Sequence, residues 1–233
     1  MFNKVFKILV IVVFPVTLFI VFGNINLKRD SYPFSVELLS SAYVIWNMDD
    51  NNPESLSDVT GKYSATPIKV KIVKGRFKKA RYFNGKYSYV LTPINFKDWE
   101  AVTISMWVKP QQKSKKDLAV IIDNGHDANS NFVLQSIDAE DVNSDRWVWH
   151  CNGADISFKL PFNEWSHIVA LADGKNGIIA AYVNGLCVGR TVVKSFEFNG
   201  TNLTIGKLSG ENKRYFKGAI DEVVIFNRAI VKE

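Results

Sequence analysis

The chain contains little cysteine, proline or glycine for its length. Its 233 residues include 2 Cys, 7 Pro and 14 Gly. Two cysteines are too few for a disulfide-dense small scaffold or a multi-cysteine zinc module. The low proline and glycine content, together with 47% hydrophobic residues, excludes a collagen-like, low-complexity or disordered chain. The composition therefore indicates a folded protein with a hydrophobic core, of a length typical of one large domain or two small ones.

Most of the chain also lacks a surplus of positive charge. The formal net charge is +6, but part of that surplus comes from four basic residues in an N-terminal stretch without acids: Lys4, Lys7, Lys28 and Arg29. Residues 30–233 hold 25 basic and 23 acidic side chains and are close to neutral. A nucleic-acid-binding domain normally has a strong basic excess. We therefore expect no nucleic acid partner.

One long apolar run lies at the N-terminus. Ile8–Phe22 holds 15 residues without a charge, after a short basic start. This pattern is typical of a signal peptide or an N-terminal signal anchor, and it predicts one N-terminal hydrophobic helix. We assign residues 1–29 to this segment and residues 30–40 to a short linker. The rest of the chain is then outside the cytoplasm, secreted if the segment is cleaved and membrane-anchored if it is retained.

The remaining chain, residues 41–233, has the pattern of a β-protein. Short runs with period-two alternation and many β-branched or aromatic residues recur between clusters of Gly, Asn and Asp, and one example is Lys69–Val73. The dipeptide Asn184-Gly185 between two apolar runs predicts a tight hairpin, because it readily adopts the positive φ angles of a type I′ turn. No segment has a sustained helical period. We predict one all-β domain, an antiparallel β-sandwich or jelly roll.

Several motifs in this region follow a recognisable order. GRFKKARYFNG at 75–85 matches the pattern G-x-x-x-x-A-x-x-F-[ND]-G, and TISMWVKP at 103–110 matches T-I-S-x-W-V-K-P. Three more motifs follow: EWSHIVAL at 164–171, AYVNGLCVG at 181–189 and FKGAIDEVVIFNRAI at 216–230. The chain resembles a LamG-like jelly roll of bacterial type, in the concanavalin A-like lectin/glucanase superfamily. The resemblance covers nearly all of residues 42–230 and implies the same sandwich.

The resemblance does not by itself select a function, because this fold serves lectins, adhesion modules, sugar-binding modules and glucanases. Glucanases of this fold carry an E-x-D-x-E strand, in which period-two spacing directs two carboxylates into one cleft. The chain lacks that pattern, and the adjacent Asp221 and Glu222 would face opposite sides of a strand. We therefore expect no catalytic residues and no enzyme activity. Polysaccharide cleavage is kept as a third alternative.

A calcium site is implied by the resemblance. Loops at the rim of these sandwiches often bind Ca²⁺ through carboxylate and carbonyl oxygens, which this hard cation prefers. The candidate ligands are Asp49 or Asp50 after the first strand, Asp58 in the DVTG turn, and Asp221 in the closing strand. The alternative is that Asp58 builds an Asx turn and Asp221 serves a local hydrogen-bond network.

Aromatic residues outside the motifs are candidates for ligand binding. Trp147, Trp149 and Cys151 alternate and therefore share one face of a predicted strand. On an exposed face the two indoles would form a platform for sugar rings, and on the inner face they would be core residues. Tyr215, near a predicted loop, is a third candidate. The framework residues Trp107 and Trp165 are predicted to be core.

A basic cluster is the last candidate surface. Seven cations and no acid lie between residues 69 and 81: Lys69, Lys71, Lys74, Arg76, Lys78, Lys79 and Arg81. Lys69 and Lys71 alternate with apolar residues, so we expect them on the solvent side of one strand. Such a patch is suited to a sulfated or carboxylated polysaccharide or to anionic lipid. The alternative is an edge strand that uses lysine to prevent aggregation.

The two cysteines and the overall function are left with alternatives. Cys151 and Cys187 lie in predicted strands, and in an exported protein they form either one disulfide or two free thiols. Our first hypothesis is a non-catalytic carbohydrate-binding, lectin-like module that binds glycan or cell-surface polysaccharide, with calcium support if the acidic site is real. The second is a structural or adhesion module that docks a protein partner.

Overall fold

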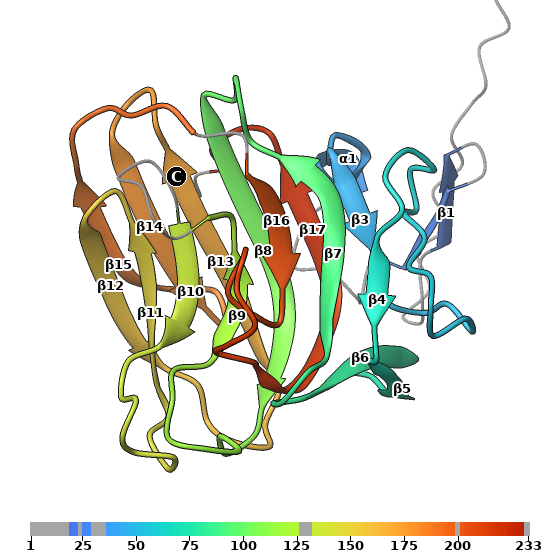
Figure 1. Cartoon of the computed structure of the whole chain (residues 1–233). Helices are drawn as coiled ribbons and strands as arrows, with labels where there is room; N and C mark the ends of the chain where they lie inside the picture. Colours follow the sequence, from blue (N-terminus) through green and yellow to red (C-terminus); the bar gives the residue numbers. More distant parts are fainter. Residues whose placement is uncertain (1–18, 23–24, 29–35, 126–131, 199–200, 231–233) are drawn as a thin grey trace, which may run out of the picture.

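The structure, a computed structural model, describes residues 19–22, 25–28, 36–125, 132–198 and 201–230. Two β-sheets lie face to face in it, and every pairing between neighbouring strands is antiparallel (Figure 1). The seven-stranded sheet contains, in spatial order, β12 (Ala154–Lys159), β11 (Arg146–Cys151), β10 (Phe132–Ser136), β9 (Val120–Asp123), β16 (Asn202–Ile205), β7 (Tyr89–Asn95) and β4 (Thr66–Ile68). The predicted all-β antiparallel sandwich is confirmed.

The second sheet has eight strands and carries the candidate site. Its order is β15 (Leu186–Val192), β14 (Ile178–Val183), β13 (Ser166–Asp173), β8 (Ala101–Pro110), β17 (Lys217–Phe226), β6 (Lys79–Asn84) and β5 (Lys71–Lys74), with β3 (Val44–Trp46) pairing with β17. Strand β17, close to the end of the chain, lies between β8 and β6. Segments far apart in the sequence therefore become neighbours on this sheet.

The hydrophobic core fills the space between the sheets. Along β8, Ile104 and Met106 are fully buried in the core, whereas the alternating Ser105 and Trp107 point to the outer face of the eight-stranded sheet. This alternation follows the period-two pattern of the sequence. Burial of one apolar face on each sheet is what holds the two layers together.

The outer face of the eight-stranded sheet is partly covered by chain segments. The short helix α1 (Val36–Ser40) places Leu39 on Ile45, Val224 and Phe226, and all four side chains are buried. This helix falls inside the predicted linker 30–40, so the end of that linker packs on the sandwich. Farther along the same face, the turn between β5 and β6 lies over β8 and β17.

The N-terminal apolar run is described only in part. The predicted hydrophobic helix falls mostly on residues 1–18, which lie outside the described residues. Its last four residues form strand β1 (Phe19–Phe22) instead, paired with β2 (Ile25–Lys28). Phe, Ile and Val are favourable strand residues, which is consistent with this pairing. Over the residues that the structure describes, we find no helix with the length and apolar character needed to cross a membrane.

The prediction of one strand over Lys69–Val73 is wrong. Strand β4 ends at Ile68 in the seven-stranded sheet, and β5 begins at Lys71 in the eight-stranded sheet. Lys69 between them has a φ of 53°, a left-handed conformation that interrupts an extended strand. The chain therefore passes from one sheet to the other here, and Lys69 and Lys71 do not share a strand face.

Candidate functional site

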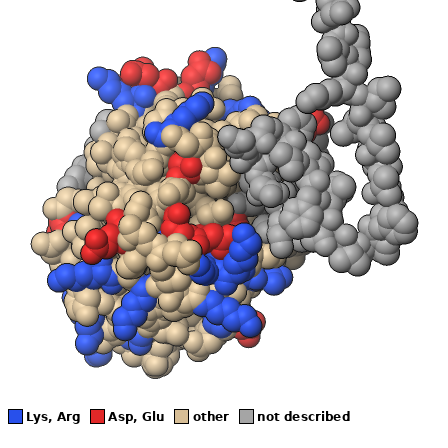
Figure 2. Space-filling model, turned by 90° about the vertical axis from the view of Figure 1, so that its right-hand side faces the viewer, with Lys and Arg blue, Asp and Glu red and all other residues tan. Residues whose placement is uncertain are grey.

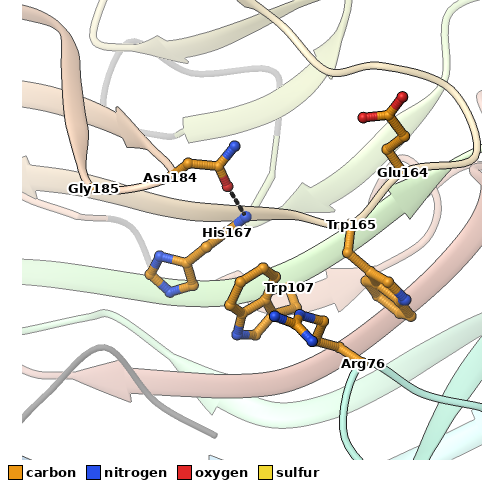
Figure 3. Close-up of a pocket in the computed structure, with 7 residues that line it drawn as sticks. All are labelled: Arg76, Trp107, Glu164, Trp165, His167, Asn184 and Gly185. Atoms are coloured by element: carbon orange, nitrogen blue, oxygen red, sulfur yellow. Dashed lines mark hydrogen bonds between the residues drawn. The ribbon is translucent and has the colours of Figure 1, made fainter. Parts of the chain in front are cut away.

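A hollow of about 680 Å³ lies on the outer face of the eight-stranded sheet, and we call it the tryptophan hollow. Its walls come from four separate segments: the β5–β6 turn, strand β8, the start of β13 and the β14–β15 turn. The lining residues are Arg76, Trp107, Glu164, Trp165, His167, Asn184 and Gly185 (Figure 3). None of the candidate calcium ligands lines the hollow, and neither Trp147 nor Trp149 does.

Two rings on adjacent strands form the floor of the hollow. Trp107 on β8 lies opposite His167 on β13 in the strand register, and their ring centroids are 5.2 Å apart. Their neighbours Met106 and Ile168 are buried in the core, so both rings point outward. Trp107 remains partly exposed. A framework strand thus contributes an aromatic ring to the outer surface.

Hydrogen bonds hold both the ring and the backbone of His167 in place. Its Nε2 lies 2.8 Å from the hydroxyl of Ser105, and its backbone N–H donates to the Asn184 side-chain oxygen at 2.8 Å. Burial lowers the pKa of His167 to about 4, so the ring is neutral at pH 7. Asn184 and Gly185 have φ angles of 50° and 82°, which confirms the predicted hairpin. This turn is therefore fixed to the floor of the hollow.

The β5–β6 turn places a guanidinium group over the floor. The Arg76 Cζ lies 4.9 Å from the ring centroid of Trp107 and 5.1 Å from that of Phe77. The Phe77 ring itself contacts Trp107 edge-on, with centroids 6.1 Å apart. Gly75 precedes them because a Cβ there would lie 2.4 Å from the carbonyl oxygen of Lys79. Arg76 thus lies close to two aromatic rings, one on the turn and one on β8.

Asp221 anchors this turn from beneath. It is fully buried on β17, opposite Trp107 in the register, and its Oδ2 accepts a hydrogen bond from the Phe77 N–H at 3.1 Å. Burial raises the pKa of Asp221 to about 7, Asp49 adds to the rise, and the backbone N–H groups of Phe77 and Arg76 oppose it. Asp221 therefore positions the turn and exchanges its proton near neutral pH.

Polar groups without partners line the rim of the hollow. Within the part of the chain that the structure describes, the Arg76 guanidinium and the Glu164 carboxylate make no hydrogen bond or ion pair, and the side-chain amide nitrogen of Asn184 donates to no group. Trp165 lies beside them and is partly exposed. The hollow thus places an aromatic face next to free hydrogen-bond donors and acceptors, a combination that suits a small ligand with both apolar and polar groups.

The candidate calcium ligands are not assembled into a site. Among the described residues, no group of three or more His, Cys, Asp and Glu side chains is placed to hold a metal ion. The Asp58 carboxylate accepts hydrogen bonds from the backbone N–H groups of Ile45, Thr60, Lys62 and Tyr63 and from the Thr60 hydroxyl. Asp50 bonds the Ser57 N–H and lies 4.0 Å from Arg81, and Asp221 holds Phe77. The turn-building alternative accounts for Asp58, and the carboxylates of Asp50 and Asp221 each have a hydrogen-bond partner in the protein.

The predicted aromatic platform is a core feature. Trp147 and Trp149 are 1% and 0% exposed, so a sugar ring cannot reach them. The Trp149 indole N–H donates to the carbonyl oxygen of Leu171 on the opposite sheet at 3.1 Å. The alternation correctly placed both rings on one face, but that face is the inner one. Tyr215 is partly exposed beside Tyr89, with ring centroids 6.4 Å apart, and does not line the tryptophan hollow.

The basic residues of the cluster do not all lie on one surface, since Arg81 is fully buried and donates to the carbonyl oxygens of Asn52 and Ser55. Lys78 forms an ion pair with Asp49 at 2.9 Å, and Lys79 bonds Asn51. Lys69 lies 5.3 Å from the Tyr87 ring centroid, near the seven-stranded sheet, whereas Arg76 faces the tryptophan hollow. Lys71 and Lys74 are exposed on the edge strand β5. Figure 2 shows the side of the molecule that is on the right in Figure 1. Basic side chains gather in the lower half of this view, and acidic side chains border them above.

The cysteines are both free. Cys151 is buried in the core on β11, and Cys187 is exposed on the edge strand β15 of the other sheet. The disulfide between Cys151 and Cys187 is therefore not formed in this structure, because one side chain points inward and the other lies at the surface. Burial raises the pKa of Cys151 to about 12.

Trp107 and Trp165 were wrongly predicted to be core residues. The signal for Trp107 is present in the sequence, since Thr103, Ser105 and Trp107 occupy alternate positions and share a face with polar residues. Glu164 and Asn184 carry no comparable signal, because only the strand order brings them next to Arg76.

Comparisons with known proteins agree with the architecture. The chain is 26% identical over 213 residues to the human adhesion G-protein coupled receptor D1, a match that covers 84% of this chain and 23% of that receptor. The chain thus spans about a quarter of the receptor's length. Among solved structures, domain 4 of AbnA, an extracellular arabinanase from Geobacillus stearothermophilus in complex with arabinotriose, has a TM-score of 0.63 and 22% identity over 80% of this chain and 92% of that chain.

A second solved structure supports the same fold. A Trypanosoma rangeli sialidase has a TM-score of 0.65 and 13% identity, covering 82% of this chain and 31% of that chain. At such identities the solved structures establish the fold alone. The family profile is more specific, because it matches residues 84–233, more than half of the chain. The chain belongs to the Concanavalin A-like lectin/glucanases superfamily, in its laminin G-like branch.

Proposed function

We propose that the domain is a non-catalytic, lectin-like carbohydrate-binding module that holds its ligand in the tryptophan hollow. The observation that carries the proposal is the convergence of Trp165 with the unpartnered Arg76 guanidinium, Glu164 carboxylate and Asn184 side-chain nitrogen in one open hollow. A sugar ring that stacks on Trp165 would place its hydroxyl groups within reach of these side chains.

Binding without catalysis is favoured by the charges in the hollow. Glycoside hydrolysis generally uses two carboxyl groups on opposite sides of the scissile bond. The hollow presents one accessible carboxylate, Glu164, and Asp221 is buried beneath the β5–β6 turn. A ligand held here would therefore leave unchanged. The related arabinanase domain was solved with arabinotriose, which adds support for a sugar ligand in this fold.

A location outside the cytoplasm completes the proposal. The uncharged run Ile8–Phe22 with its basic flank has the composition of an export segment. If the segment is retained, the domain is anchored at the outer face of the membrane, and if it is cleaved, the domain is secreted. Either location gives the hollow access to cell-surface or environmental polysaccharide.

A glycan array followed by titration calorimetry tests the proposal on the full chain in mild detergent. We expect saturable binding to a set of related glycans, with Trp165→Ala lowering the affinity at least tenfold. Tyr87→Ala is the matched control, because Tyr87 is 51% exposed and does not line the hollow. An empty array with correctly folded protein, or equal losses in the two variants, would contradict the proposal.

A protein-docking adhesion module is the second candidate function. Three of the exposed large apolar side chains lie on the edge strand β15, namely Leu186 at 73%, Val188 at 38% and Val192 at 77% exposure. An apolar sheet edge is a common docking surface for another protein. A partner that binds the chain in pull-down assays and is lost with Val192→Lys, while Trp165→Ala still binds it, would favour this function over the first.

A further inference from the structure

We propose that the tryptophan hollow selects glycans that carry a carboxylate, with Arg76 as the residue that recognises the acidic group. This inference rests on the proposed function and names the class of ligand. A uronic acid residue, which combines a pyranose ring with a carboxylate, is the simplest member of that class.

Arg76 lies over two aromatic rings, and its hydrogen-bond donors have no partner among the described residues. The Arg76 Cζ is 4.9 Å from the ring centroid of Trp107 and 5.1 Å from that of Phe77, within the range of a cation–π interaction with each. A cation–π contact uses the charge of the guanidinium and not its hydrogen-bonding capacity, so the N–H donors stay available. In Figure 3 the end of the Arg76 side chain overlaps the Trp107 ring, on the side toward Trp165. The donors are therefore presented to a ligand beside Trp165.

The charge of Arg76 is not neutralised by a neighbour. Of the nearby cations on the same turn, Lys78 is paired with Asp49 and Lys79 is bonded to Asn51. Arg76 has no ion pair within the described residues. The Glu164 carboxylate points away from it (Figure 3), and Asp221 is directed at the backbone of the turn. An anionic ligand would supply the counter-ion that Arg76 lacks.

A carboxylate fits this cation better than a hydroxyl group does. Arginine binds a carboxylate through two parallel hydrogen bonds, and hydrogen bonds to charged groups are about twice as strong as neutral ones. Glu164 would repel an acid placed beside it, so the ligand's carboxylate lies at the Arg76 side and its hydroxyls at the Glu164 side. We expect a uronic acid to bind at least roughly tenfold more tightly than the matching neutral sugar.

Paired oligosaccharides test the inference on the full chain. Oligogalacturonate is compared with oligogalactose, and a glucuronic-acid-terminated glycan with its glucose-terminated counterpart, by calorimetry at constant ionic strength. Arg76→Gln is expected to abolish the preference for the acidic member and to leave the affinity for the neutral member within about threefold. Arg76→Lys, which keeps the charge but lacks the planar fork, is expected to retain only part of the preference.

A matched control separates specific recognition from general attraction. Lys71→Gln removes the same charge from an exposed position on β5, outside the hollow, and should leave the preference intact. An equal loss in Lys71→Gln and Arg76→Gln would overturn the inference, as would stronger binding of sulfated than of carboxylated probes. Neutral sugars that bind through Trp165 with no acid preference would overturn this inference and leave the proposed function standing. No glycan binding at all would overturn both.

Discussion

Asp221 and His167 should give the domain two opposing dependences of stability on pH. The pKa of the buried Asp221 is raised from 3.8 to about 7. Between those pH values the unfolded chain loses the proton and the folded chain retains it, so the free energy of unfolding falls as pH rises. At 1.36 kcal/mol per pH unit, the full loss is roughly 4 kcal/mol.

His167 acts in the opposite direction. Burial lowers its pKa from 6.5 to about 4, so between these values the unfolded chain binds a proton that the folded chain does not. Its contribution to stability is therefore complete above pH 6.5 and is lost as pH falls through the folded pKa, by roughly 3 kcal/mol. From pH 4 to 6.5 the two effects nearly cancel, and we expect the wild-type stability to change little.

The substitution Asp221→Asn should reveal how much Asp221 contributes to the pH dependence of the free energy of unfolding. The amide resembles the protonated acid and still offers an oxygen to the Phe77 N–H. We expect the variant and the wild type to be equally stable at pH 4, with the variant gaining up to roughly 4 kcal/mol over the wild type by pH 7.5. His167→Gln should show the reverse slope below pH 6.5.

Urea unfolding monitored by tryptophan fluorescence at half-unit pH steps measures these slopes. Glu54→Gln is the control, because Glu54 is exposed and forms no ion pair among the described residues, so this substitution should not alter the pH profile. If the stability difference between Asp221→Asn and the wild type stays constant from pH 4 to 7.5, the reasoning about Asp221 is refuted.

Three further predictions concern packing, the thiols and the β5–β6 turn. Trp149→Ala should lower the free energy of unfolding by about 3–5 kcal/mol in urea titrations, while glycan affinity of the folded protein stays unchanged, because this side chain is in the core. Cys187 should react with a maleimide reagent in the folded protein, and Cys151 only after unfolding, as peptide mapping of the label would show. Gly75→Ala should weaken glycan binding measured by calorimetry, because its Cβ would meet the Lys79 carbonyl at 2.4 Å and displace the turn. Equal labelling of both thiols, or unchanged binding in Gly75→Ala, would contradict the respective prediction.

The framework could be predicted because its signals are local. The alternation of apolar and polar residues at 103–108 appears as the inner and outer faces of β8, and Asn184-Gly185 forms the expected turn. Each of these features depends on a few consecutive residues whose backbone preferences agree with the fold. The apolar face of β8 can be predicted without knowing its partner strand, since burial of that face is favourable in any sandwich.

The site could not be predicted because its residues meet only through the strand order. Arg76, Trp107, Trp165 and Asn184 come from segments that are separated by up to about a hundred residues and converge on one face. The alternation of Trp147 and its neighbours likewise identifies a shared face but not whether that face is the inner or the outer one. That choice depends on which sheet covers the strand, which is information about the whole chain.

Asp221 illustrates how one framework residue links stability to recognition. Its position in the closing strand resembles a metal-binding position, yet its oxygen holds the backbone of the turn that carries Arg76. The buried Asp221 carboxyl group, with a pKa of about 7, therefore helps to hold Arg76 over Trp107. Asp221→Asn keeps an acceptor for the Phe77 N–H and Asp221→Ala removes it. Binding of an acidic sugar should consequently survive the first substitution and weaken in the second, because the hydrogen bond, and not the charge, is what places Arg76 over the hollow.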